Sequence, residues 1–113
     1  MQLAGAARLY AYKTLWRRTG LRSAGRALVH ALGSADEDLR VIAGMFLAQA
    51  GKQAVPLLQE ALTRRENLPM VLSILGDIGD RKFEPELRRF SQDSDPKIAQ
   101  AARDALRVLD AHQ

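Results

Sequence analysis

An internal repeat with a period of 29 to 30 residues constrains the fold of this chain more than any other feature of its sequence. Three successive segments align, and they are residues 24–53, 54–82 and 83–111. Leucine and isoleucine share columns of that alignment, and the two clearest columns are Leu28, Leu58, Leu87 and Leu39, Leu68, Ile98. Repeats of about 20 to 50 residues are typical of architectures in which one unit stacks on the next. This repeat is long enough for two short helices and two turns.

The last segment shows a helical period most clearly. Ile98, Ala102, Ala105 and Leu109 recur at spacings of three and four residues, which places them on one face of a helix. The strict alternation of apolar and polar residues that a half-buried strand needs is absent from the chain. The same reading along the chain predicts helices near residues 3–18, 22–32, 36–50, 53–64, 67–79, 82–92 and 95–111.

Turn residues fall where the repeat period requires them. Ser34 and Glu37 form the pattern of a capping box, which predicts that Ser34 begins a helix. Asp95 followed by Pro96 predicts an N-cap and a proline at the first helical position. Three prolines are compatible with helices because each can occupy a first turn, and they are Pro56, Pro69 and Pro85. Three glycines are expected to end helices in the left-handed conformation, and they are Gly33, Gly51 and Gly79.

Two pairs of segments carry a resemblance to a known family. "DEDLRVIAGMFLAQAG" and "DSDPKIAQAARDAL" resemble the first helix of HEAT-like repeats, with an Asp, a small apolar–basic pair, an Ala and a Leu. "LGDIGD" followed by "FEPEL" resembles the end of that helix and the proline-bearing second helix. The short period is similar to that of the phycobilisome-lyase type of HEAT-like repeat. The resemblance covers residues 22–111, with Pro69 in place of the basic residue in the middle repeat and no match for residues 1–20.

The resemblance implies an all-α fold, a short right-handed α-solenoid of about three stacked antiparallel helix pairs. Residues 21–113 form this HEAT-like repeat domain, and residues 1–20 form an extra, basic and aromatic N-terminal helix. One such helix pair cannot bury its apolar stripe alone, so neighbouring pairs share a continuous core. We expect the last helix, which has a broad polar face, to cap the stack.

Charge is distributed unevenly along the chain. Residues 1–35 contain six basic and no acidic side chains, whereas residues 36–113 contain 11 basic and 13 acidic ones, so the net charge of +4 originates in the N-terminal third. The chain has no cysteine, no signal-peptide pattern and no run of about 18 uninterrupted apolar residues. We therefore expect a cytoplasmic protein without a transmembrane segment.

Residues suited to catalysis are few. The two histidines, His30 and His112, have no partner at metal-ligand spacing, and no phosphate-binding glycine pattern occurs. Asp77 and Asp80 form the one tempting carboxylate pair, but they stand at a helix end, where capping explains them better. We predict a protein that is not an enzyme and has no cofactor and no metal.

The repeat predicts a candidate binding surface. In HEAT-like stacks the second helices line the concave face, which here implies a row of polar side chains that a protein or peptide partner could contact. The row comprises His30, Gln59, Glu60, Thr63, Arg88, Arg89 and Gln92. A basic row begins each second helix and could hold an acidic segment, and it comprises Arg22, Lys52 and Arg81. Solvated helix surface is the simpler alternative for any single residue of these rows.

The N-terminal helix is a second candidate surface. Aromatic and basic residues are interleaved in it, namely Tyr10, Tyr12, Trp16, Lys13, Arg17 and Arg18. Such a pattern could bind nucleic acid or an anionic membrane surface, although nucleic acid is the less favoured partner. The helix could also cap the first repeat through Leu3, Ala7, Tyr10 and Thr14, or form a homodimer.

Overall fold

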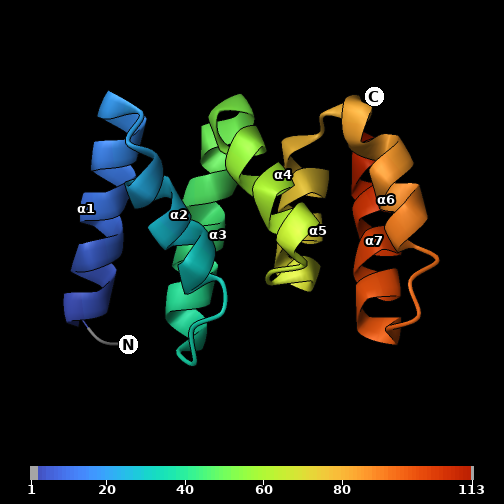
Figure 1. Cartoon of the computed structure of the whole chain (residues 1–113), viewed down its shortest axis with the longest axis horizontal. Coiled ribbons are helices and arrows are strands. Elements are labelled where there is room, and N and C mark those ends of the chain that lie inside the picture. The colour runs from blue at the N-terminus through green and yellow to red at the C-terminus, as the bar shows by residue number, and fades with distance from the viewer. Residues whose placement is uncertain (1–2, 113) are drawn as a thin grey trace.

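The computed structural model describes residues 3–112, which measure 38 × 27 × 25 Å and form α-helices and 3₁₀ turns with no strand in that range. The α-helices are α1 (Leu3–Thr19), α2 (Arg22–Ala31), α3 (Glu37–Ala50), α4 (Val55–Arg64), α5 (Leu68–Ile78), α6 (Glu84–Phe90) and α7 (Pro96–Ala111) (Figure 1). The 3₁₀ turns are η1 (Gly51–Ala54) and η2 (Arg81–Phe83). The all-α class is therefore confirmed, and each α-helix lies where the sequence predicts one.

Aspartates begin two of the long helices. The carboxylate of Asp95 accepts a hydrogen bond from the Lys97 backbone N–H at 2.9 Å, with Pro96 at the first helical position, as predicted. Asp36 caps α3 in the same way by accepting from the Asp38 N–H. The predicted capping role of Ser34 is wrong, because its hydroxyl accepts from the Asp36 N–H at 3.1 Å and so shapes the turn before the cap.

The second and third repeats enter their helices through 3₁₀ turns. The sequence predicts helices from residues 53 and 82, but α4 begins at Val55 and α6 at Glu84, after η1 and η2. Asp80 explains the second delay, since its carboxylate accepts from the Lys82 N–H and starts η2 first. The prolines lie in the first turns of α4, α5 and α6, as expected.

One of the three predicted left-handed glycines is confirmed, since Gly79 ends α5 with φ +76° and ψ +23°. Gly51 has φ +58° but ψ −122°, so it has the positive φ that glycine enters without steric cost but not the left-handed helical conformation. Gly33 does not have a positive φ. A Cβ at Gly33 would stand 2.7 Å from the Asn67 side-chain oxygen, so a larger residue would require the Asn67 side chain to shift.

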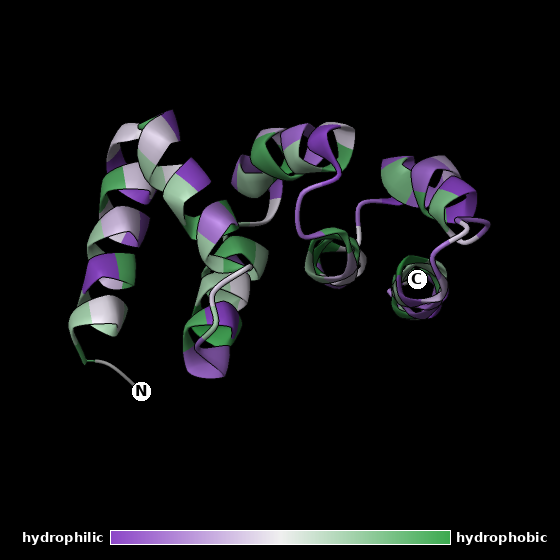
Figure 2. Cartoon of the chain, turned by 60° about the horizontal axis from the view of Figure 1, so that its bottom comes forward, coloured by the Kyte–Doolittle hydropathy of each residue, from purple (hydrophilic) through white to green (hydrophobic). Residues whose placement is uncertain are grey.

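The helices lie in two rows. α3 contacts α1 on one side and α5 on the other, and α5 makes its most extensive contact with α7, so the odd-numbered helices form one row. α2 and α4 contact each other in the second row, which α6 continues with only marginal contact to α4 (Figure 2). α1 and α7 lie at opposite ends of the long axis (Figure 1).

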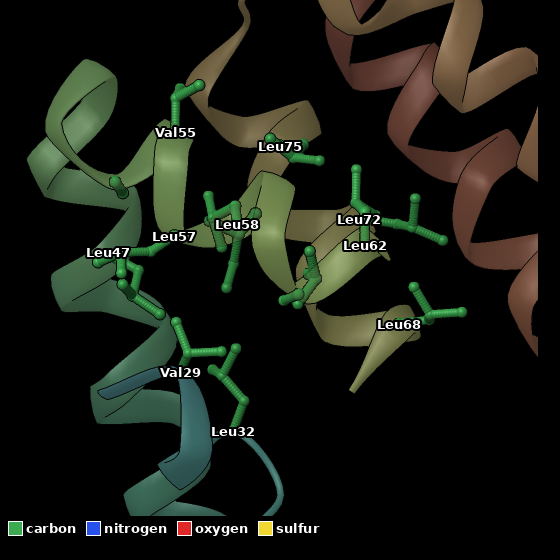
Figure 3. Packing of buried hydrophobic residues seen from close by; sticks show 14 of the residues in the cluster. Val29, Leu32, Leu47, Val55, Leu57, Leu58, Leu62, Leu68, Leu72 and Leu75 are labelled. Atoms are coloured by element: carbon green, nitrogen blue, oxygen red, sulfur yellow. The ribbon is translucent and has the colours of Figure 1, made fainter. Parts of the chain in front are cut away.

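The core between the rows is built from the repeated leucines. Leu28, Leu58 and Leu87, which share a column of the repeat, are each 0 % exposed. Figure 3 shows side chains of α2, α3, α4 and α5 meeting in one cluster. Burying a leucine fully contributes roughly 1.5–3 kcal/mol relative to leaving it in water. The repeat therefore supplies each layer of the core with an equivalent apolar side chain.

The N-terminal helix contributes to this same core. Leu9 and Trp16 of α1 are 5 % and 2 % exposed and belong to the cluster that includes the repeat leucines. The predicted packing stripe is wrong, because Leu3 is 81 % and Tyr10 57 % exposed. The two apolar stripes of α1 are offset by about 100°, the angle between successive helical residues such as Leu9 and Tyr10. The stripe containing Trp16 packs inward and also meets α2 at Gly25.

The backbones of α5 and α7 approach closely at the C-terminal end of the molecule. A Cβ at Gly76 of α5 would stand 2.9 Å from both the Cα and the carbonyl oxygen of Ala105 in α7. Because the obstacle is backbone, no side-chain rotation could relieve it. Small residues at both positions therefore allow α5 and α7 to pack directly together.

One helical stretch within residues 3–112 has the length and apolar composition of a membrane span. It is Glu37–Arg64, with a hydropathy of 1.3 over its best window, and it comprises α3, η1 and α4. The chain changes direction at Gly51, and 44% of that window is buried inside the structure. A core helix passes the same test by composition, so this finding is weak evidence for a span.

Candidate functional site

A cleft of about 550 Å³ opens where α1, α2 and the α4–α5 turn meet. Apolar groups of Leu9, Ala27 and Leu39 form part of its lining, and polar side chains stand among them. The polar lining residues are Arg8, Tyr12, His30, Ser34, Glu66 and Asn67. We call this cavity the α1–α2 cleft. Its volume lies within the range of roughly 300–1,000 Å³ that is usual for ligand sites.

A smaller cleft of about 190 Å³ lies between α2 and α4. It is lined by Arg26, Val29, His30, Leu57, Glu60, Ala61, Arg64 and Glu66, and we call it the α2–α4 cleft. His30 and Glu66 line both clefts. The two cavities therefore adjoin, and together they form a groove that runs from α1 across α2 to α4.

Glu60 carries the strongest electrostatic contacts of the α2–α4 cleft. Its carboxylate accepts from Arg26 Nε at 3.0 Å and lies 3.4 Å from Arg64 Nη1. The hydrogen bond from Arg26 and the neighbouring positive charges lower the pKa of Glu60 below its ordinary value. Glu60 is therefore ionised at neutral pH and holds two arginines at the edge of the groove.

The α4–α5 turn holds one wall of the groove in an unusual backbone conformation. Arg65 and Asn67 have φ +54° and +50°, which residues with side chains adopt infrequently. Two long-range hydrogen bonds support the turn: Asn67 Nδ2 donates to the Val29 carbonyl at 3.2 Å, and Arg65 Nη2 donates to Asp93 at 3.0 Å. The pKa of Asp93 is lowered, mainly because its carboxylate accepts a hydrogen bond from the Asp95 N–H and also because it binds Arg65. The turn is thus tied to α2 on one side and to the α6–α7 loop on the other.

The structure brings only part of the predicted binding row into the groove. His30 and Glu60 line it, whereas Arg88 and Arg89 are exposed on α6, which makes marginal contact with α4. Arg88 lies 3.6 Å from Glu84 in its own helix, and Arg89 stacks over the Phe90 ring at 5.6 Å. The other members of the row are the exposed Gln59, Thr63 and Gln92.

Several groove residues were not identified from sequence. Arg26 lies one helical turn before His30, so the helical period could have placed it beside the row. Glu66 and Asn67 lie in a turn where the middle repeat is one residue shorter than the other two, and no periodic signal extends there. Arg8 and Tyr12 come from α1, which matches no repeat.

The predicted basic row does not form one surface. Lys52 and Arg81 line a common cleft of about 740 Å³ beside η1 and η2, together with Lys82 and Asp80. Arg81 is bound to Glu84 at 2.9 Å and to Asp110 at 3.5 Å, so acids already surround it. Arg22 lies apart from this cleft, at the start of α2, where its charge acts on Glu60.

The outer side of α1 presents two further clefts. One, of about 310 Å³ towards α3, is lined by Lys13, Thr14, Arg17, Arg18, Phe46 and Gln49, and we call it the basic cleft. The other, of about 460 Å³, is lined by Tyr10, Ala11, Thr14, Leu15, Arg18 and Thr19, and we call it the apolar cleft. Arg17 and Arg18, predicted as a basic surface, are thus side by side, and no carboxylate lines either cleft.

Among residues 3–112, no group of three or more His, Asp or Glu side chains is arranged to hold a metal ion. The sequence matches no protein-family profile and no curated protein, and the structure matches no solved structure.

Proposed function

We propose that this protein is a non-enzymatic HEAT-like repeat module that binds a protein or peptide partner. In this proposal the pairs α2–α3, α4–α5 and α6–α7 are the repeats of a short right-handed α-solenoid, with α1 as the extra N-terminal helix. The partner lies along the face formed by α2, α4 and α6.

The observation that carries the proposal is the adjoining pair of clefts. His30 and Glu66 belong to both, so a bound segment that spans these two residues can contact both clefts. An apolar floor with a polar rim is the usual anatomy of a protein-binding surface. The groove suits an extended peptide with one bulky apolar side chain in the α1–α2 cleft.

The charges of the groove specify the partner further. Arg26 and Arg64 flank Glu60 at one end, and the carboxylate of Glu66 stands between the two clefts. A partner with both acidic and basic side chains matches these groups, because each rim charge then gains an opposite neighbour. Rim charges of this kind contribute more to specificity and association rate than to affinity.

A random peptide library displayed on phage, panned against the immobilised protein, tests the proposal. Selected peptides should bind in fluorescence anisotropy, and binding should weaken at least about tenfold in Glu66→Lys and measurably in Arg88→Glu/Arg89→Glu. Arg17→Glu/Arg18→Glu, an equal change of charge on α1, is the matched control and should leave the affinity unchanged. Peptides that bind Glu66→Lys as tightly as the parent would refute the groove as the site.

A second candidate function is binding of nucleic acid or an anionic membrane surface through α1. The observation that favours it is the cluster of Lys13, Arg17 and Arg18 in the basic cleft, where no acid offsets them. Binding to a single-stranded oligonucleotide would weaken steeply with salt, and Arg17→Glu/Arg18→Glu would flatten that dependence by about one unit of slope per charge. Binding that does not respond to salt would exclude this candidate.

A further inference from the structure

The outer side of α1 combines apolar and basic character in one continuous surface. Thr14 and Arg18 line both the apolar cleft and the basic cleft, so the two cavities adjoin along the helix. Tyr10 and Leu15 on α1 are 57 % and 45 % exposed, and Phe46 of the neighbouring α3 lines the basic cleft. We call this region the α1 outer surface. The apolar cleft lies on the side of α1 away from Leu9 and Trp16, the basic cleft lies beside α3, and both are separate from the groove.

The cations of the α1 outer surface are not neutralised by the protein itself. Within residues 3–112, neither Arg17 nor Arg18 forms an ion pair, and residues 1–35 contain no carboxylate side chain. Lys13 is held over the rings of Tyr10 and Phe46, with its Nζ 4.9 Å from each ring centroid. A partner that binds this surface would therefore contact three positively charged side chains next to exposed apolar groups.

We infer that the α1 outer surface binds an acidic amphipathic helix supplied by a partner protein. Apolar side chains of that helix occupy the apolar cleft, and its carboxylates meet Lys13, Arg17 and Arg18 in the basic cleft. The adjoining arrangement of the two clefts requires a ligand that presents apolar and acidic groups side by side, which an amphipathic helix does.

The position of α1 in its row favours a helix as the occupant. α3 and α5 each have a helix of the odd-numbered row on both sides, whereas α1 has only α3 (Figure 1). A docked helix would lie against α1 as α1 lies against α3, at the ordinary spacing of about 8–10 Å. It would continue the row by one element.

Nucleic acid fits the α1 outer surface less well. Stacking on bases needs free aromatic faces, but Trp16 is 2 % exposed, and the Tyr10 ring has Lys13 over one face and Phe46 at 5.0 Å in an edge contact. A second copy also fits less well, since a symmetric contact would bring the cations of two α1 helices together without acids between them.

A pair of synthetic peptides tests the inference. The first is a fluorescein-labelled helix of about 18 residues, five turns, with leucine on one face and glutamate on the flanks, and the second has lysine in place of every glutamate. The glutamate peptide should bind at least about tenfold more tightly than the lysine peptide in fluorescence anisotropy. Amide shifts in the ¹⁵N-labelled protein should be confined to α1 and the adjoining side of α3.

Two charge-reversal pairs provide a matched control. Arg17→Glu/Arg18→Glu should weaken the glutamate peptide about tenfold or more. Lys97→Glu/Arg107→Glu, the same change of charge at two exposed positions of α7, should leave it within about twofold. Leu15→Ser should weaken both peptides, because it removes apolar area.

Three results would overturn the inference. Equal affinities for the two peptides would show that charge does not select the ligand. A single-stranded oligonucleotide that displaces the glutamate peptide and loses affinity in the same α1 variant would assign the surface to nucleic acid. Light scattering that shows a dimer in the parent protein and a monomer in Leu15→Ser would assign it to a second copy.

Discussion

The two end helices, α1 and α7, finish their row in opposite ways. The exposed face of α7 is a network of its own polar side chains, in which Gln100 and Arg107 both bind Asp104, and Arg103 binds Gln100 at 3.1 Å. The exposed face of α1 has cations without acids beside partly exposed apolar side chains such as Leu15. The polar groups of α7 are therefore paired with one another, whereas the cations Arg17 and Arg18 of α1 have no ion-pair partner within residues 3–112.

This difference separates two tasks that a terminal helix can perform. A cap needs an apolar inner stripe and a polar outer face, because it ends the core and remains soluble. α7 meets both conditions, with Ile98, Ala102 and Leu109 buried. α1 meets only the first, since Leu9 and Trp16 are buried while its outer face exposes Tyr10 and Leu15.

Removal of the Trp16 ring tests whether α1 belongs to the core, and it should have the largest effect. Trp16→Ala should lower the free energy of unfolding by about 3–5 kcal/mol, because a fully buried ring is lost and a cavity remains. Urea denaturation followed by circular dichroism measures this. A loss below about 1 kcal/mol would mean that α1 packs only loosely on the core. The two end helices would then differ in how well they pack and not in the chemistry of their exposed faces.

Crowding the contact between α5 and α7 tests the other end. Gly76→Val should cost about 2–3 kcal/mol, because the new atoms meet the Ala105 backbone, which cannot rotate away. Gly44→Ala is the control, since a Cβ there would have contacts no closer than 3.7 Å. It should stabilise the protein by up to about 1 kcal/mol through helix propensity. Equal effects of the two changes would contradict the close packing of α5 on α7.

Acid should weaken the middle of the molecule more than its N-terminal end. The pKa values of Glu60 and Asp93 are lowered from their ordinary 4.5 and 3.8 by arginine and backbone hydrogen bonds. Their contribution is therefore complete at neutral pH and is lost as the pH falls from about 4.5 through the folded-state pKa values. Urea midpoints measured across this range should fall in the parent protein and fall less in Glu60→Gln/Asp93→Asn. Parallel curves would mean that these ion pairs do not contribute.

A substitution on the α1 outer surface should have the smallest effect on stability. Leu15→Ser should change the free energy of unfolding by no more than about 0.5 kcal/mol, since Leu15 is 45 % exposed. The same denaturation experiment checks this against Trp16→Ala, one residue along the helix. A large loss would place Leu15 in the core and remove the distinction between the two faces of α1.

The helices could be predicted because their signals are local. Asp95 and Pro96, and the prolines at the starts of α4 and α6, act within one turn of the residues they affect. The predicted start of a helix was wrong where two local signals compete. Asp80 can begin either η2 or α6, and it begins η2.

The orientation of α1 could not be predicted, because both of its stripes are apolar. The choice between them depends on Gly25, which lets the Trp16 ring approach α2, and that contact joins residues of different helices. Only part of the groove could be predicted, again because some of its residues are positioned by long-range contacts. His30 and Glu60 repeat with the period, whereas Glu66 and Asn67 lie in a turn whose backbone is fixed by long-range bonds to Val29 and Asp93.

The polar network on α7 also bears on self-association. A head-to-tail contact between identical chains generates an open filament when the same pair of surfaces can be used repeatedly. The Gln100–Asp104–Arg107 network makes much of the exposed face of α7 polar, with Val108 exposed at 38 %. This face is a poor match for the exposed apolar side chains of α1 in a second copy, which disfavours a filament built from repeated α1–α7 contacts.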